Sequence, residues 1–117
     1  MSSNSFYNNY FLTNIILPYE KNFIGSYDFY NCIFFKSLNL SKNITVINGN
    51  AFYGCESLKN ICLSNNITSI GERAFYGCGS LKNICLSNNI TSIENGVFNN
   101  CTSLEFINIP ESIVNIG

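Results

Sequence analysis

The sequence contains a near-exact internal repeat that restricts what the chain can fold into. Residues 51–73 (AFYGCESLKNICLSNNITSIGER) are followed at once by residues 74–96, which differ from them at only 4 of 23 positions. A fixed period of this size indicates a solenoid, in which repeats stack on one another and share a continuous core. The sequence therefore predicts a stack of equivalent coils, each one 23-residue repeat long.

The period extends over nearly the whole chain. Steps of 23 residues from Phe52 reach Phe6, Phe29, Phe75 and Phe98. Such a set of equivalent positions is called a column here, and five further columns hold mostly Leu or Ile. Their members are Leu12, Phe35, Leu58, Leu81 and Leu104; Ile15, Leu38, Ile61, Ile84 and Ile107; Leu17, Leu40, Leu63, Leu86 and Ile109; Ile44, Ile67, Ile90 and Ile113; and Ile24, Ile47, Ile70, Ile93 and Ile116. We predict a short tail at 1–4 and a solenoid over 5–117, with units 5–27, 28–50, 51–73, 74–96 and 97–117.

Spacing within one repeat predicts its local structure. Apolar residues two positions apart have the period of a strand, so residues 60–63 and their equivalents are expected to be short strands with alternate side chains inward. Residues 67–70 form a second extended segment, and 71–78 a tight return, in a 3₁₀ or single helical turn, with Phe75 and Cys78 inside. Stacking then gives a continuous parallel sheet, which we expect on the concave face.

The repeat also resembles a known family. The succession Leu58-x-x-Ile61-x-Leu63, then Ile67-x-x-Ile70-Gly71-x-x-Ala74-Phe75-x-x-Cys78, is similar to the 23-residue leucine-rich repeat of the BspA-like (Treponema-type) family. Residues 104–117, LEFINIPESIVNIG, show its proline form. The resemblance implies a β-rich leucine-rich-repeat solenoid with a binding role, often cell-surface adhesion or host contact, and no shared catalytic residues.

The six cysteines fall into two columns. Cys32, Cys55, Cys78 and Cys101 face the core, where small thiols fill a tight corner, whereas Cys62 and Cys85 point outward from neighbouring strands. The two columns cannot converge on one ion, so we expect no zinc, no other metal and no cofactor. We expect Cys62 and Cys85 to be free and accessible. A disulfide between them is the alternative, but parallel side chains give it poor torsion.

The outward face of the strands is the usual binding surface of a solenoid and supplies the candidate site. We predict that a partner is bound there by Lys36, Lys59, Lys82, Asn60, Asn83, Cys62, Cys85 and Phe106. Lysine heads and amide groups would serve as donors to an acidic or amide-rich partner. The alternative is a solvated face copied by duplication, without a binding role.

Two other columns have alternative interpretations. The tyrosines at 7, 30, 53 and 76 are half-buried with their hydroxyls outward, or they form an aromatic contact strip on the convex side. Asn43, Asn66, Asn89 and Asn100 each begin an Asn-x-Thr sequon, which we interpret as a product of turns rich in Asn and Thr rather than as glycosylation sites.

Composition and charge restrict the function further. The net charge of −1 and pI near 5.2 give no general attraction to nucleic acid or to anionic lipid. The chain has no His and no recognisable nucleophile and base pair, so we expect no enzyme. Without an apolar run long enough to span a membrane, or a signal peptide, a cytoplasmic location is predicted, while the resemblance implies the cell surface.

The leading hypothesis is a non-catalytic module that binds an unidentified protein partner, with surface adhesion or host contact as the version implied by the family. The alternative is a structural or assembly unit: a fragment of a longer solenoid, or a scaffold that stacks end to end inside the cell. Unpaired strand edges at the ends of a solenoid would favour such self-association.

Overall fold

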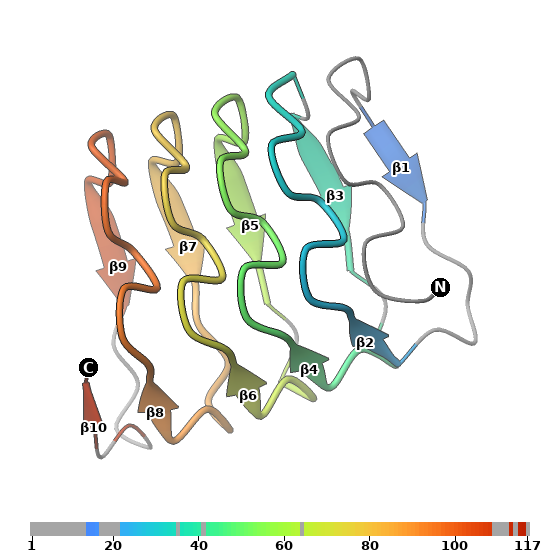
Figure 1. The fold of residues 1–117 in the computed structure, drawn as a ribbon. Coiled ribbons are helices and arrows are strands. Elements are labelled where there is room, and N and C mark those ends of the chain that lie inside the picture. Colours follow the sequence, from blue (N-terminus) through green and yellow to red (C-terminus); the bar gives the residue numbers. More distant parts are fainter. Residues whose placement is uncertain are drawn as a thin grey trace.

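The fold, taken from a computed structural model, is built of short parallel strands that recur with the 23-residue period (Figure 1). The structure describes residues 14–16, 22–34, 36–40, 42–63, 65–108, 113 and 115–116. The strands are β1 (Asn14–Ile16), β2 (Phe23–Ile24), β3 (Ser37–Asn39), β4 (Val46–Ile47), β5 (Asn60–Cys62), β6 (Ser69–Ile70), β7 (Asn83–Cys85), β8 (Ser92–Ile93), β9 (Phe106–Asn108) and β10 (Asn115–Ile116). No helix occurs within these ranges.

The strands lie in two rows. In Figure 1 the three-residue strands form the upper row and the two-residue strands form the lower row. The three-residue strands pair as β1–β3 and β5–β7–β9, and the two-residue strands pair as β2–β4–β6 and β8–β10. Every pairing is parallel, and the register joins residues 23 apart, as in Asn60 with Asn83. The predicted extended segments are confirmed by these strands. The pairing of β3 with β5 is not defined by the described residues, so a sheet continuous along the whole row stays a prediction.

The predicted columns form the core. Phe29, Phe52 and Phe75 are fully buried, and their rings stack face to face, with centroids 5.1 Å apart for the first pair and 5.2 Å for the second. The leucine and isoleucine columns are buried or partly buried at every position whose side chain the structure describes. Stacked aromatic pairs add about 0.5–1.5 kcal/mol each to the stabilisation from burial. The core assignment made from the sequence is therefore confirmed for the described residues.

The expected 3₁₀ or helical turn at 71–78 is wrong, because the segment consists of turns. Ala74, Tyr76 and Cys78 donate their N–H groups to the carbonyl three residues back. The N–H groups between them donate instead to the next coil, in the pairs Arg73 to Asn95, Phe75 to Val97 and Gly77 to Asn99, at 3.0, 3.1 and 2.8 Å. A helix needs consecutive local hydrogen bonds, and here every second donor is used between coils.

Left-handed backbone conformations recur at two positions of every described return segment. One column is Tyr27, Asn50, Arg73 and Gly96, with φ between 56° and 70°, and the other is Asn31, Gly54, Gly77 and Asn100, with φ between 56° and 75°. Glycine adopts this region without steric cost, whereas other residues pay for it. Five of the eight positions hold a residue other than glycine. The return segment therefore keeps its shape in spite of the local preference of several of its residues.

The backbones of two coils approach each other closely at Gly71. A Cβ atom placed on Gly71 would lie 2.3 Å from the nitrogen of Gly49, 2.7 Å from its Cα and 2.8 Å from the carbonyl carbon of Asn48. The Gly71 N–H also donates to the carbonyl of Ile47 at 2.8 Å. The absence of a side chain at Gly71 therefore leaves room for the two backbones to come this close.

Candidate functional site

The candidate site is the outward face of the three-residue strands, and its centre lies on β5 and β7. Asn60 and Cys62 are exposed on β5, with a buried isoleucine between them, and Asn83 and Cys85 repeat the same pattern on β7. The alternation follows from the strand geometry, which turns successive side chains to opposite faces. The predicted outward orientation of these four side chains is confirmed.

The asparagines of the two strands are joined to each other. The side-chain amide of Asn83 donates from Nδ2 to Oδ1 of Asn60 at 2.9 Å. An amide group has two N–H donors and two acceptor lone pairs, so one such bond leaves further capacity on both residues. The bond orients the two amides relative to each other on the solvent side of the sheet. The backbone of Phe106 in β9 pairs in register with that of Asn83 in β7. The side chain of Phe106 lies outside the described part of the structure.

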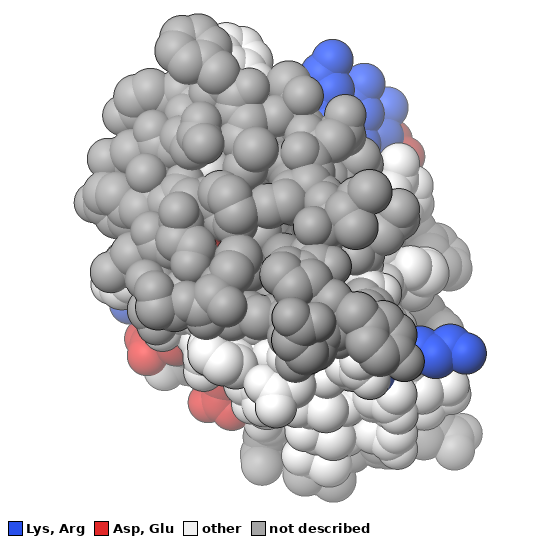
Figure 2. Space-filling model, turned by 90° about the vertical axis from the view of Figure 1, so that its right-hand side faces the viewer, with Lys and Arg blue, Asp and Glu red and all other residues white. Residues whose placement is uncertain are grey.

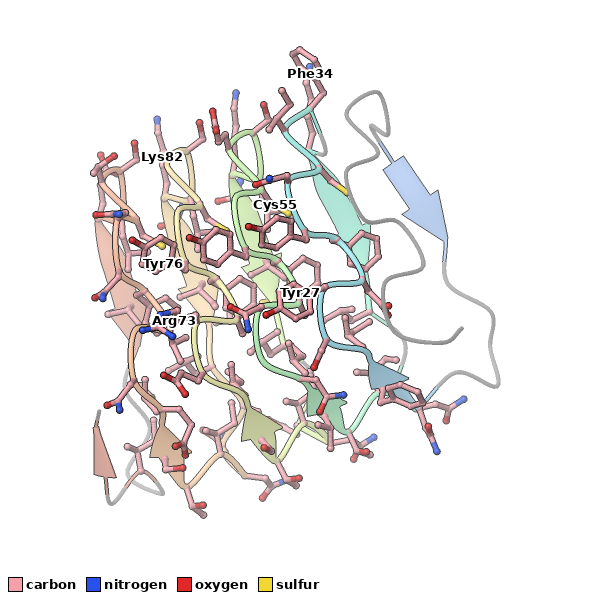
Figure 3. The ribbon with its side chains drawn as sticks, viewed as in Figure 1. Tyr27, Phe34, Cys55, Arg73, Tyr76 and Lys82 are labelled. Carbon is pink, nitrogen blue, oxygen red and sulfur yellow. The ribbon has the colours of Figure 1, made fainter. Side chains whose placement is uncertain are left out.

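A lysine directly precedes each of three neighbouring three-residue strands. Lys36, Lys59 and Lys82 are exposed, and the backbone N–H of Lys82 donates to the carbonyl of Lys59 at 2.8 Å. Figure 2 shows basic side chains gathered along the upper right edge of the molecule, and Figure 3 places Lys82 at the top, where its coil enters β7. The next residue of the column is the exposed Glu105. The site therefore carries a short positive row that ends at a negative residue.

The outward cysteines are direct neighbours across the sheet. Cys62 and Cys85 are register partners in β5 and β7, and both are free and exposed, which confirms the prediction of two accessible thiols. A hydrogen bond between the two thiols raises the pKa of Cys62, with smaller contributions from burial and from the charge of Cys85. Both sulfur atoms therefore lie close together on the solvent side of the sheet.

The inward cysteines have a structural role. The thiols of Cys55 and Cys78 donate to the carbonyl oxygens of Phe29 and Phe52 in the preceding coil, at 3.1 and 3.3 Å. Burial is the main cause that raises the pKa of Cys55. For Cys78 the hydrogen bond with Cys101 is the largest cause of a raised pKa, followed by burial. Both thiols thus stay protonated at neutral pH and remain available as donors between coils.

No cluster of three or more potential metal ligands occurs among the residues that the structure describes. The two cysteine columns lie on opposite faces of the strand layer, one in the core and one in solvent, as the sequence predicted.

The tyrosine column lies beside the phenylalanine core, on the return segments. Tyr30, Tyr53 and Tyr76 are half-buried and stacked, with ring centroids 4.9 Å apart for the first pair and 4.6 Å for the second. The Asn100 amide donates to the Tyr76 hydroxyl at 3.1 Å. Figure 3 shows Tyr76 within this row of rings. Half-buried packing is confirmed for these three residues, and Tyr7 lies outside the described residues.

Sequence reasoning missed two exposed aromatic residues, Tyr27 and Phe34, which are 38% and 48% exposed. Phe34 stands in a column whose other members are Phe11, Ser57, Ser80 and Ser103. The change from phenylalanine to serine along this column is the signal that would have identified it. Figure 3 shows Phe34 at the top of the molecule, on the same edge as Lys82.

The sequon asparagines connect coils. Asn66 donates from Nδ2 to the carbonyl of Lys42 at 2.7 Å, and Asn89 donates in the same way to the carbonyl of Asn65. The hydroxyl of Thr68 contributes a similar bond. Such bonds satisfy backbone carbonyls in the turns after the strands. They give the asparagine-rich turns a structural role that does not depend on glycosylation.

Short parallel strands stacked at a 23-residue register, over a core of leucine, isoleucine and phenylalanine columns, define a leucine-rich-repeat solenoid. The family model of the BspA type leucine rich repeat region (6 copies) matches residues 1–117. The chain therefore belongs to the BspA-type leucine-rich-repeat family, as its repeat pattern predicted.

Solved structures of bacterial repeat proteins are similar to the chain. A leucine rich cell surface protein from Faecalibacterium prausnitzii is 31% identical with a TM-score of 0.85, and the match covers 99% of this chain and 28% of that one. The pneumococcal vaccine antigen PcpA is 27% identical with a TM-score of 0.73, over 97% of this chain and 26% of that one. The Treponema pallidum leucine-rich-repeat protein TpLRR shares the fold at 23% identity and a TM-score of 0.75, over 100% of this chain and 65% of that one.

The chain thus spans about a quarter of the length of two of these proteins and two thirds of the third. Comparison with curated protein sequences finds no match. Within its described residues, the structure holds no helix of the length and apolar character that crossing a membrane requires.

Proposed function

We propose that the chain is a non-catalytic protein-binding module that docks its partner on the outward face of the three-residue strands. The observation that carries this proposal is the exposed, coil-by-coil repetition of Lys, Asn and Cys over strands anchored by a buried column. Rigid strands hold such side chains in fixed positions more accurately than loops do. We take this face as the concave one, and the unit boundaries as those predicted from the period.

The chemistry of the face favours an acidic partner in an extended conformation. Neighbouring strands lie about 4.8 Å apart, so Lys59 and Lys82 repeat at nearly the spacing at which one coil follows the next. Each exposed ion pair contributes only about 0.2–1 kcal/mol, so binding requires several rows together. The amides of Asn60 and Asn83 add donors and acceptors that can pair with the partner's peptide groups.

Surface adhesion or host contact is the specific version that we propose. Support comes from the Faecalibacterium prausnitzii relative, which is a leucine rich cell surface protein. The chain spans 28% of that relative, so this role is carried over by similarity alone. The absence of His from the sequence agrees with a non-catalytic role.

The docking face is tested with an acidic probe, a fluorescent ten-residue glutamate peptide, by anisotropy at low ionic strength. Lys59→Glu is expected to weaken binding by about threefold to tenfold, since it removes one attraction and adds a repulsion. Lys42→Glu, at an exposed lysine in the turn after β3, is the matched control. Both variants should keep the wild-type free energy of unfolding within about 0.5 kcal/mol.

Equal loss of binding in the two lysine variants would contradict a specific docking face, because it would show that only net charge matters. No binding of the peptide to the wild type would refute the acidic chemistry of the partner.

The location is tested on intact producing cells with a membrane-impermeant thiol reagent and mass spectrometry of the Cys62 and Cys85 peptides. Labelling before lysis supports surface adhesion, and labelling only after lysis supports a scaffold inside the cell. The alternative of an assembly unit that stacks end to end is tested by light scattering at several concentrations. A monomer at every concentration would exclude that alternative.

A further inference from the structure

Cys62 and Cys85 form a pair of thiols on the outward face of the strands, outside the core. They are register partners on adjacent parallel strands, and both are free and exposed. Because the strands are parallel and in register, the two side chains leave the sheet in the same direction. Neighbouring strands of a sheet lie about 4.8 Å apart, so two side chains that leave register partners in the same direction can reach a common third atom.

This arrangement suits a bridging ion better than a disulfide bond. A disulfide requires a dihedral angle near 90° about the S–S bond, and two parallel side chains on neighbouring strands give that angle poorly. Two sulfur atoms that point the same way can instead bind one atom placed between them. The described residues hold no cluster of three or more potential metal ligands, which is inconsistent with the four-ligand geometry of structural zinc.

The remaining candidates for an ion bound by these two thiols are soft metal ions of low coordination number. Thiolates select Cu(I) among the biological metal ions, and Cu(I) is stable with two sulfur ligands in a nearly linear arrangement. The neighbouring Asn60 and Asn83 amides offer oxygen and nitrogen, which a soft ion does not prefer. The class of ion therefore follows from the number and the kind of ligands.

We propose that Cys62 and Cys85 together form a two-sulfur binding site for a soft monovalent cation of the Cu(I) class. Binding replaces two S–H bonds by two S–Cu bonds and releases two protons, so the metal keeps its oxidation state and no oxidant is required. The site gains one negative charge, and the exposed Lys59 and Lys82 directly precede the same two strands. The proposal does not depend on a protein partner.

The chain supplies its own control residues. The positions equivalent to Cys62 and Cys85 on the flanking strands β3 and β9 are Asn39 and Asn108. The variants Cys62→Asn and Cys85→Asn therefore introduce a residue that the fold already carries in the same column. Both variants are expected to fold, which thermal unfolding checks before any metal is added.

The experiment uses the reduced full chain under anaerobic conditions, with Cu(I) supplied as its complex with bathocuproine disulfonate. The wild type should take up one Cu(I) per chain, as measured by loss of the chelator's absorbance and by native mass spectrometry. Each asparagine variant should bind more than about 100-fold more weakly, since even the loss of an outer-shell partner of a metal ligand costs tenfold to a hundredfold. Uptake should strengthen with pH, by up to about a hundredfold per pH unit for two released protons.

Three results would overturn the proposal. Uptake retained in both asparagine variants would assign the metal to other thiols. One Cu(I) per two chains would show that the metal bridges two molecules. An intramolecular disulfide that forms readily in air, with no uptake of Cu(I) by the reduced chain, would make the pair a redox pair instead of a metal site.

Discussion

Substitution of Gly71 by Ala tests the close approach of two coils. The added Cβ would lie 2.3–2.8 Å from three backbone atoms of Gly49 and Asn48, where ordinary contacts begin near 3.4 Å. The two backbones must separate by about 1 Å, because no flexible side chain is available to move aside. Overpacking of this kind costs about 1–3 kcal/mol, and the weakened hydrogen bond from Gly71 to Ile47 adds about 0.5–1.5 kcal/mol.

The expected loss is therefore about 2–4 kcal/mol in the free energy of unfolding, which lowers Tm by roughly 8–16 °C for a domain of this size. Gly79→Ala is the matched control, since the nearest atom to its Cβ would be the Thr102 hydroxyl oxygen at 3.9 Å. We expect this control to be neutral or slightly stabilising, because it reduces the freedom of the unfolded chain. Guanidinium unfolding followed by circular dichroism measures both. If the two variants differed by less than about 0.5 kcal/mol, the steric argument would be refuted.

Three further predictions concern the core, the return segment and the outward thiols. Phe75→Ala removes a fully buried, doubly stacked ring and should cost about 3–5 kcal/mol by chemical denaturation; a cost below about 1 kcal/mol would contradict its place in the core. Arg73→Gly relieves a left-handed conformation with φ of 56° and should raise the free energy of unfolding by up to about 1 kcal/mol, whereas a loss would show that the Arg73 side chain outweighs the strain. Because its raised pKa keeps Cys62 protonated at neutral pH, alkylation by iodoacetamide should become fast only above the ordinary thiol pKa of 9.0. Cys85→Asn should lower that pKa and speed alkylation at pH 8, and an unchanged rate would argue against the thiol hydrogen bond.

Much of the fold could be predicted because each column repeats the same kind of side chain at the same place in successive coils. Phe29, Phe52 and Phe75 could be assigned to the core, since rings at the same place in successive coils stack on one another. The alternation of Asn60, Ile61 and Cys62 likewise decided which face is outward. The 23-residue period and the alternation of apolar residues are therefore enough to predict the core columns and the outward face of the strands.

The return segment could not be predicted in the same way. Its shape depends on N–H groups that alternate between acceptors in the same coil and acceptors in the next coil. Nearly every residue type has a backbone N–H group, so the sequence does not show which acceptor each one uses. The left-handed columns are marked by glycine only at Gly54, Gly77 and Gly96, and elsewhere hold residues such as Tyr27 and Arg73. The close approach at Gly71 could not be predicted either, because the same column also contains Asn48 and Glu94.

The candidate site was predicted as a surface but not as a set of interactions. The exposed positions of Asn60, Asn83 and the outward cysteines followed from the strand period. The hydrogen bond between the side-chain amides of Asn83 and Asn60 depends on rotamers that the sequence does not specify. The exposed Phe34 required a comparison within its own column, because isolated surface aromatics are common and carry no signal by themselves.

The register has a consequence for how the length of this molecule can change. In the part of the chain that the structure describes, the side-chain hydrogen bonds between coils join residues 23, 24 or 26 positions apart, as between Asn83 and Asn60, Asn66 and Lys42, or Cys78 and Phe52. Every coil is thus held by its immediate neighbours only. Removal of residues 74–96, or insertion of a second copy of them, would leave each junction with partners of nearly the same kind. Unequal recombination between the two near-identical segments could therefore shorten or lengthen the binding surface in whole coils, without a new fold having to be found.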